Sequence, residues 1–401
     1  MKKFSVLLSG LLSAILLLTS CGTQTTQTYS NMNLYCQLGD TLYLNDRDIV
    51  LNGALDTVIS LCRDPLCSHD DYDSTCPESP WFAAQEYYQT DGERIFMYVN
   101  DIRPGIELLN ETGSSAQFRT IYSFLPLESE MRKIAEFESL GQLTGLPFML
   151  SGDYVYFKQN HYLDADARTD EVFRLMRVKK TGGKPEEVLE RDIPVSVSIA
   201  VSGSRIYLSD TAGDGACEIV DMETGITETA APEGKRVQQV CVQEDTVYFF
   251  CDGTVRTDSA GTEFVSTDIY RYEDSGGFTL IAQDVWNARF SGGALWISPA
   301  SLTYYGTAEL PTGRGNEIEM MDIYDRDTGE LIRLDPVTGE KQSWTTDRHI
   351  DFLGYSAGYA LARLVDYVEY LETGVRDNTI YKLTLNDDGT VTIAGTIDEV
   401  N

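Results

Sequence analysis

The stretch that decides the fold lies at residues 151–189, which read SGDYVYFKQNHYLDADARTDEVFRLMRVKKTGGKPEEVL. A turn at Gly152 precedes a predicted strand at residues 154–157, and a loop separates this strand from a second one at residues 172–178. A paired-glycine turn then leads into a last strand near Val188. Short β-rich runs between glycine turns are typical of a small antiparallel sheet, because glycine adopts the positive φ that tight turns require.

The same pattern recurs along the chain. A tight turn, usually with glycine, is followed by a β-rich run that usually ends in an aromatic residue, at intervals of about 40 to 65 residues. The repeat resembles that of the β-propeller family over about residues 33–398, and it implies blades of four antiparallel strands around a central channel. The seven turns begin at Gly39, Gly92, Gly152, Gly203, Glu244, Gly292 and Ala357.

We therefore predict an all-β fold, a β-propeller of seven blades with six or eight as alternatives, in a single domain at residues 33–401. Two tandem sandwiches, the rival all-β architecture, would not repeat the same turn in this way. Consecutive Thr-Gly turns at Gly329 and Gly339 predict an extra strand in the sixth blade. Residues 133–137 are predicted as a strand rather than a helix, because they occupy the fourth-strand position of the second blade.

The N-terminus predicts export. Two lysines follow Met1, an apolar run occupies residues 4–18, and small residues precede Cys21. This arrangement is typical of a secretory signal, here residues 1–20, because so short an apolar run spans a bilayer poorly. The Leu-Thr-Ser-Cys ending resembles the lipobox of bacterial lipoproteins, which implies that Cys21 is lipidated and anchors the chain on the extracytoplasmic face of the cell membrane. Polar residues 21–32 then form a flexible tether. The alternative is an ordinary signal peptide with a chance cysteine.

The composition limits the class of partner. The chain has a net charge of −32 and is 42% apolar, so it can bury a large core but repels the phosphates of nucleic acids. The acidic balance is explained either by basic partners and cations or by the solubility of an exported protein. We expect a monomer without a cofactor, which contacts the membrane through its lipid anchor alone.

Candidate ligand-binding residues lie in the connections between the second and third strands of the blades, which leave a propeller on one face. Tyrosine and arginine combine broad contact area with a polar group, and they are enriched where proteins bind partners. The alternative is that the tyrosines pack the loops against one another. Five of these connections are long, at residues 100–117, 158–171, 252–267, 299–316 and 363–378. Their residues suited to recognition are His161, Tyr162, Asp164, Asp166, Arg168, Tyr304, Tyr305, Arg314, Tyr367, Tyr370 and Glu372.

A cysteine-rich stretch follows the third strand of the first blade. It contains Cys62, Cys67, His69 and Cys76, a set that could hold zinc, although its spacing is not the CxxC type. The competing hypotheses are disulfides with Cys36 as a further partner, which export permits, and reduced thiols. The Cys-x-Asp-Pro-x-Cys-x-His run is similar to one found in uncharacterised bacterial propeller lipoproteins. Three further cysteines lie on or beside predicted strands, where we expect one disulfide and one buried thiol: Cys217, Cys241 and Cys251.

The sequence contains no catalytic signature. It lacks a GxSxG elbow, an HExxH helix and a phosphate-binding glycine loop, and its three histidines fall in different predicted blades. The run from Asp210 to Asp221 resembles a calcium loop only loosely and is better explained as a hairpin turn. We therefore predict a non-catalytic lipoprotein that binds a protein or glycan partner through its long-loop face. The alternative is a surface enzyme that acts on glycans or cell-wall polymers through acidic residues at the channel mouth.

Overall fold

In a computed structural model, the described residues of the chain fold almost entirely into antiparallel β-sheets. The predicted all-β fold is confirmed over the part of the chain that the structure describes. The predicted signal peptide, Cys21 and the tether at 21–32 lie outside the described residues. The described residues are 35–38, 41–44, 49–51, 58–60, 85–101, 116–125, 132–140, 147–164, 169–191, 197–210, 215–243, 245–257, 261, 263–273, 275–311, 318–373 and 379–397.

Five sheets have four strands each, and within each sheet every strand pairs with the next one along the chain. The first two sheets are β1 (Tyr35–Leu38), β2 (Thr41–Leu44), β3 (Ile49–Leu51) and β4 (Val58–Ser60), then β5 (Gln85–Thr90), β6 (Ile95–Asp101), β7 (Ala116–Phe124) and β8 (Arg132–Leu140). The next two are β9 (Phe148–Ser151), β10 (Tyr154–Asp164), β11 (Thr169–Lys179) and β12 (Glu186–Arg191), then β13 (Val197–Ser202), β14 (Arg205–Asp210), β15 (Cys217–Asp221) and β16 (Thr227–Ala230). The last is β25 (His349–Ser356), β26 (Tyr359–Val365), β27 (Ile380–Leu385) and β28 (Val391–Ile397).

The sixth sheet has eight strands because two long strands each pair with different partners along their length. The first half of β20 pairs with β19, and from Val285 onward β20 pairs with β21 instead. Near its start β21 pairs with β23, and beyond Ala300 it pairs with β22. The extra strand predicted next to the two Thr-Gly turns is therefore confirmed. The strands are β17 (Val237–Gln243), β18 (Thr246–Thr257), β19 (Glu263–Tyr272), β20 (Phe278–Ser291), β21 (Ala294–Pro311), β22 (Ile318–Asp327), β23 (Glu330–Leu334) and β24 (Lys341–Thr345).

Three hairpins extend well past their sheets, and we call them arms: β10–β11, β18–β19 and β21–β22. The prediction of a loop at residues 158–171 is wrong over most of that range, because β10 and β11 stay paired out to Asp164 and Thr169. Strands also occupy much of the loops predicted at 252–267 and 299–316. The prediction ended each strand where the apolar alternation ended, but backbone pairing between two strands does not require an apolar face.

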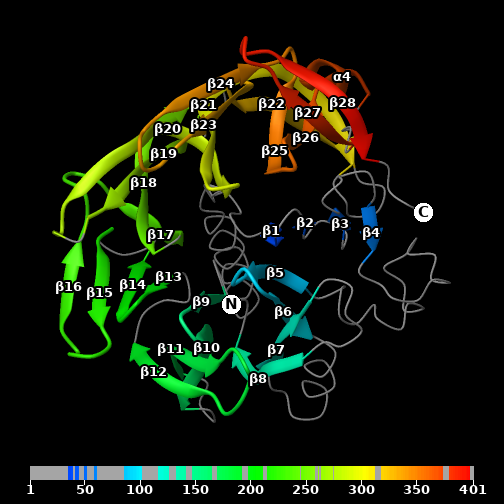
Figure 1. Cartoon of the computed structure of the whole chain (residues 1–401). Coiled ribbons are helices and arrows are strands. Elements are labelled where there is room, and N and C mark those ends of the chain that lie inside the picture. Colours follow the sequence, from blue (N-terminus) through cyan, green and yellow to red (C-terminus); the bar gives the residue numbers. More distant parts are fainter. Residues whose placement is uncertain are drawn as a thin grey trace, which may run out of the picture.

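The sheets follow one another in sequence order around a common centre (Figure 1). The first strands of neighbouring sheets contact each other, as β1 does with β5, β5 with β9, β9 with β13 and β13 with β17. The last sheet contacts the eight-stranded sheet through β25 and β20, and β25 also contacts β2 of the first sheet. The arrangement therefore resembles the blades of a propeller.

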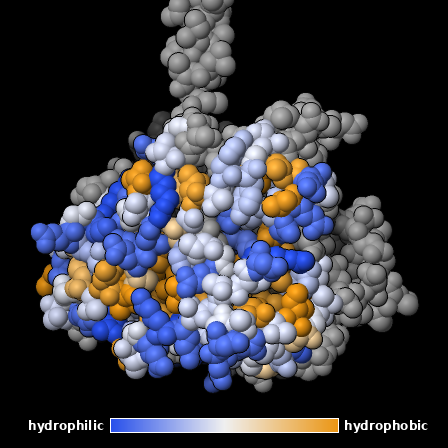
Figure 2. All heavy atoms as spheres, turned by 90° about the horizontal axis from the view of Figure 1, so that it is seen from above, coloured by the Kyte–Doolittle hydropathy of each residue, from blue (hydrophilic) through white to orange (hydrophobic). Residues whose placement is uncertain are grey.

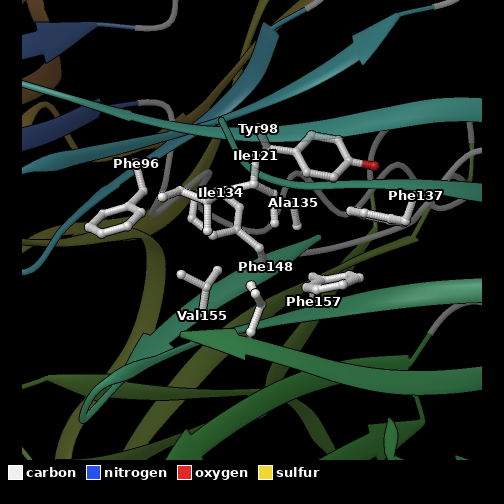
Figure 3. Close-up of a cluster of buried hydrophobic side chains, with 10 residues drawn as sticks. Phe96, Tyr98, Ile121, Ile134, Ala135, Phe137, Phe148, Val155 and Phe157 are labelled. Atoms are coloured by element: carbon white, nitrogen blue, oxygen red, sulfur yellow. The ribbon is translucent and has the colours of Figure 1, made fainter. Parts of the chain in front are cut away.

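The core lies between adjacent sheets rather than within any one of them (Figure 3). Between the β5–β8 and β9–β12 sheets, the rings of Phe137 and Phe157 stack with their centroids 4.2 Å apart, and Tyr98 stacks on Phe148 at 6.3 Å. Each large apolar side chain buried in this way contributes about 1.5–3 kcal/mol to stability. The strand predicted at residues 133–137 is confirmed as part of β8, which supplies Phe137.

One short helix, α4 (Tyr367–Thr373), follows β26 in a connection that we predicted as a loop. Among the residues that the structure describes, no helix is long and apolar enough to cross a bilayer. Hydrophilic side chains cover much of the surface in Figure 2, between smaller hydrophobic patches, as expected for a chain with a net charge of −32. The strands on either side of the hairpin turn predicted between Asp210 and Asp221 are paired, because Ser209 pairs with Cys217 across β14 and β15. Residues 211–214 of this turn lie outside the described residues.

Candidate functional site

Among the described side chains of the three arms, the most exposed aromatic residues lie on the β21–β22 arm. Its ladder is irregular between Tyr304 and Gly306, where Tyr304 pairs with Tyr324 and Gly306 pairs with Ile323. Tyr305 is thus the extra residue of a β-bulge, a feature that redirects a side chain out of the regular alternation. Tyr304 remains 49% exposed and Tyr305 36% exposed.

Helix α4 packs against this arm and fixes the tyrosines. The ring of Tyr305 stacks on that of Tyr367 with centroids 5.3 Å apart and planes 14° from parallel. The Tyr304 hydroxyl lies 2.8 Å from Thr307 Oγ1. We call the surface formed by Tyr304, Tyr305 and Tyr367 the aromatic ledge. Tyrosine offers broad amphipathic contact area with few rotatable bonds, so a ledge held in this way is suited to binding.

Close packing between α4 and the arm explains why the ledge is rigid. Ile323 of β22 is buried against Tyr367, Tyr370 and Leu371. Gly306 has a φ of +146°, and a Cβ atom at this position would lie 3.0 Å from Leu371 Cδ2. Only glycine therefore allows both this backbone conformation and the close approach of the helix.

A histidine and an aspartate lie directly behind the ledge. The His349 ring meets Tyr367 edge to face at 5.4 Å, and His349 Nδ1 lies 3.1 Å from Asp325 Oδ1. Both side chains are about nine-tenths buried, at 10% and 8% exposure. Sequence reasoning missed this pair, because the two residues lie in separate sheets and neither belongs to a recognisable motif.

The start of α4 is capped by an acidic residue, and its outer surface is acidic. Asp366 Oδ1 accepts hydrogen bonds from the backbone N–H groups of Val368 and Glu369, both at 3.0 Å. This is the arrangement of an N-cap residue, which satisfies amides that have no partner within the helix. Glu369 and Glu372 are exposed, and no basic residue lies in the last turn.

The β10–β11 arm presents a different set of groups. His161 Nε2 lies 3.5 Å from Glu190 Oε2, and Arg174 contacts both Glu187 and Glu190, at 3.2 and 2.5 Å. Burial lowers the pKa of His161, and the nearby Arg174 guanidinium lowers it further. The carboxylates of Glu190 and Glu187 raise this pKa but do not offset the other two effects. The side chains of His161 and Arg174 therefore pair with carboxylates of their own sheet.

Lys158 lies at the base of the same arm and is 1% exposed. Its ammonium donates a hydrogen bond to the carbonyl oxygen of Val197 in the neighbouring sheet. Burial lowers the pKa of Lys158 to about 7, because the charged form loses its hydration in the interior. This lysine joins two sheets from the inside and is not accessible to a ligand.

The β18–β19 arm is tied to its neighbour by a polar network around the buried Asp268. Lys235 Nζ lies 2.7 Å from Asp268 Oδ2, and Asp268 Oδ1 accepts a hydrogen bond from the Asp284 amide at 2.9 Å. The carboxylate of Asp284 binds Arg256 through both terminal nitrogens, and this pairing lowers the pKa of Asp284. The network fixes the arm at the point where β20 changes partner.

The structure brings together only part of the predicted ligand-binding set. Tyr304, Tyr305, Tyr367 and Tyr370 gather around the β21–β22 arm, whereas His161 lies in another sheet. Tyr162 and Asp164 lie on β10, but their side chains, like Asp166, Arg168 and Arg314, lie outside the described residues. The alternative role for the tyrosines also holds in part, because Tyr367 and Tyr370 pack between the arm and α4.

The predicted cysteine site cannot be placed. Cys62, Cys67, His69 and Cys76 lie outside the described residues, and so does the side chain of Cys36 on β1. Among the described residues, no group of three or more His, Cys, Asp or Glu side chains is placed to hold a metal.

The predicted disulfide among the remaining three cysteines is wrong, because Cys217, Cys241 and Cys251 are all free thiols. Burial raises the pKa of Cys217, and it raises those of Cys241 and Cys251 to about 12. Thiols this far from ionisation are structural core residues with low reactivity.

No family model and no curated protein matches the chain. Similar solved structures include the β-propeller domain of the Trilobed protease from Pyrococcus furiosus, at 12% identity and a TM-score of 0.43, covering 77% of this chain and 84% of that one. The periplasmic gluconolactonase of Pseudomonas aeruginosa is similar at 14% identity and a TM-score of 0.43, and the match covers 92% of this chain and 95% of that one. The oligogalacturonate lyase of Vibrio parahaemolyticus is similar at 11% identity and a TM-score of 0.40, and the match covers 69% of this chain and 76% of that one. Likenesses this distant say nothing of the activity of this chain.

Proposed function

We propose that the chain is a seven-bladed β-propeller, held by a lipid outside the cytoplasmic membrane, that binds a protein or glycan partner through the face carrying its arms. Division of the eight-stranded sheet at β20 supports the blade count, because the first half of β20 then closes one blade and the second half opens the next. The contacts of β25 with both β20 and β2 support a closed ring.

The anchor is supported by the sequence around Cys21. The wild-type chain should incorporate labelled palmitate in cells and sediment with membranes. The Cys21→Ala variant should incorporate none, because its thiol is absent, and it should lose the lipid that holds it at the membrane. An unlabelled wild-type chain that stays in the soluble fraction would overturn the anchor and leave the binding proposal untouched.

The aromatic ledge carries the binding proposal. Tyr305 is redirected by the bulge and held by its stack on Tyr367, yet it keeps 36% of its surface exposed. Loops and hairpins held by a rigid scaffold commonly carry function, and buried or half-buried tyrosines are frequent hot spots in interfaces. The ledge would therefore provide a preorganised contact whose binding costs little side-chain entropy.

Peptide and glycan arrays probed with the lipidated mature chain in neutral detergent would test this proposal. We expect retention on a subset of array members, and we expect the Tyr304→Ala/Tyr305→Ala variant to lose about tenfold or more of that signal. Ile226→Ala and Val337→Ala are matched controls, because both residues are exposed apolar side chains away from the arms. A tyrosine variant that keeps the full signal would rule out the ledge as the binding site.

The buried Asp325–His349 pair favours a second candidate function, a surface enzyme that acts on glycans. A histidine oriented by a carboxylate is a common general base, and this one lies directly behind exposed tyrosines. Reducing-end release from cell-wall glycan fragments would test it. Activity that the His349→Gln variant abolishes supports the enzyme, whereas the absence of release by the wild-type chain contradicts it.

A further inference from the structure

The aromatic ledge lies beside α4, a helix with two exposed glutamates and no basic residue in its last turn. We propose that the ledge and the outer surface of α4 together receive a cationic polypeptide segment, rich in lysine or arginine, of an extracytoplasmic partner. This inference rests on the proposed binding function and adds the chemical class of the partner. It is carried by three observations: the charge of the arm and helix, the exposure of the tyrosines, and the way tyrosines elsewhere in this chain hold cations.

Acidic residues outnumber basic ones in the sequence that contains the ledge. Residues 300–327 and 366–373 include nine acidic and two basic residues, several of whose side chains lie outside the described part of the structure. Glu369 and Glu372 are exposed on α4, and their carboxylates form no ion pair within the described part of the chain. Acidic carboxylates beside a contact surface accelerate the approach of a cationic partner and penalise an anionic one.

The tyrosines complement this charge. A lysine or arginine side chain over a tyrosine ring is attracted by the negative face of the ring. Tyrosines of this chain make such contacts internally: Arg177 lies 4.7 Å from the ring centroid of Tyr154, and Lys382 lies 4.4 Å from that of Tyr359. Tyr304 and Tyr305 keep 49% and 36% of their surface exposed, so a cationic side chain of a partner can reach them.

Other partners fit this surface less well. Nucleic acids and anionic lipid surfaces would be repelled by the local carboxylates and by the net charge of −32. A neutral glycan would stack on the tyrosines but would gain nothing from Glu369 and Glu372. A cationic polypeptide alone uses both the aromatic and the acidic features of the site.

The test uses the lipidated mature chain in an uncharged detergent and a fluorescent peptide of about twelve residues in which lysine alternates with serine or glycine, with binding read as fluorescence anisotropy. A glutamate version of the peptide and a neutral chito-oligosaccharide are the comparison probes. We expect the lysine peptide to bind, the glutamate peptide not to bind, and the Kd of the lysine peptide to rise steeply between about 50 and 500 mM salt.

Two variants test the location of the site. Tyr305→Ala and Glu369→Gln/Glu372→Gln should each raise the Kd of the lysine peptide about tenfold or more. The matched control is Glu223→Gln/Glu228→Gln, which removes the same number of charges from exposed positions on the β15–β16 hairpin. This control should change the Kd by less than about twofold at the same salt concentration.

The outcomes separate this inference from the proposed function. Equal losses of affinity for the lysine peptide in Glu369→Gln/Glu372→Gln and in the control Glu223→Gln/Glu228→Gln would overturn the inference, because the attraction would then arise from the whole acidic surface. Binding of the chito-oligosaccharide that depends on Tyr305, without binding of the lysine peptide, would overturn the cationic partner and keep the binding face. Peptide or glycan arrays without any tyrosine-dependent binding would overturn both.

Discussion

The β10–β11 arm and the β21–β22 arm are both hairpins that extend past their sheets, but their chemistry differs. Residues 154–179 contain four acidic and five basic residues, and Arg174 pairs with Glu187 and Glu190 of its own sheet. Residues 294–327 contain six acidic and two basic residues and expose two tyrosines. An arm whose charges are neutralised internally offers little to a partner, so position in the scaffold does not by itself create a binding surface.

The two arms are also held in different ways. The base of the β10–β11 arm contains a fully buried lysine that donates to the neighbouring sheet, whereas the β21–β22 arm is supported from outside by a short capped helix. The first arm therefore contains a buried amine whose desolvation lowers stability, and the second depends on close packing at Gly306. Four substitutions test this difference, in order of the effect we expect.

Lys158→Met should have the largest effect. Burial lowers the pKa of Lys158 to about 7 in the folded chain, from 10.5. The unfolded chain thus binds more protons between these values, so the free energy of unfolding should rise with pH across this window and be lowest below pH 7. Lys158→Met should raise the free energy of unfolding near pH 7 by about 3 kcal/mol and flatten that rise.

Urea unfolding from about pH 6 to 10 would measure this effect, within the usual linear treatment. Lys179→Met is the control, because Lys179 lies on β11 of the same arm and is exposed. If the free energy of unfolding changed with pH in the same way for the wild-type chain and the Lys158→Met variant, burial of the amine would not destabilise the fold.

Gly306→Ala should have the next largest effect, and it acts on the other arm. Alanine must adopt a φ of +146° and place its Cβ 3.0 Å from Leu371, which together should cost about 2 kcal/mol. Gly293→Ala is the control, because Gly293 also has a positive φ but a Cβ atom there would meet nothing within 4 Å. Thermal unfolding should show that adding Leu371→Ala recovers part of the loss at Gly306 and none at Gly293.

Asp366→Ala should cost about 1 kcal/mol, because it leaves the amides of Val368 and Glu369 without their acceptor. Asp366→Asn should cost much less, since its side-chain oxygen can accept the same hydrogen bonds. Hydrogen exchange of the α4 amides would measure the change locally. Unaltered exchange in the alanine variant would mean that packing on the arm, and not the cap, holds the helix.

Arg174→Gln should have the smallest effect on stability, about 0.5 kcal/mol, because its ion pairs are partly exposed. It should also raise the pKa of His161, since the guanidinium is one of the groups that lower it, while burial continues to keep that pKa down. An NMR titration of His161 would measure this shift. Arg177→Gln should leave the pKa in place, because Arg177 pairs with Glu186 instead.

Much of the fold was predictable because its signals are local. The turn at Gly152 and the β-rich run after it identify a strand pair without reference to the rest of the chain. The arms were predicted as loops because residues such as Gln159 and Asn160 give no apolar alternation, although backbone pairing with β11 continues past them. Helix α4 was missed for a related reason: its seven residues are too few for a helical period to show, and the arm stabilises it.

The candidate site was predictable in part. Tyr304, Tyr305, Tyr367 and Tyr370 were selected because their residue type and connection suit recognition, and the structure places all four around one arm. His349 carried no such signal, because only its position behind Tyr367 makes it part of the site.

The sequence by itself determined the order of the β-strands, because turn residues and strand alternation act over a few neighbouring positions. Only the tertiary structure decided that the two halves of β20 pair with different strands, that Tyr305 stacks on Tyr367, and that Asp325 meets His349. These contacts join residues far apart in the chain, and their geometry depends on how sheets pack, which no short sequence pattern encodes.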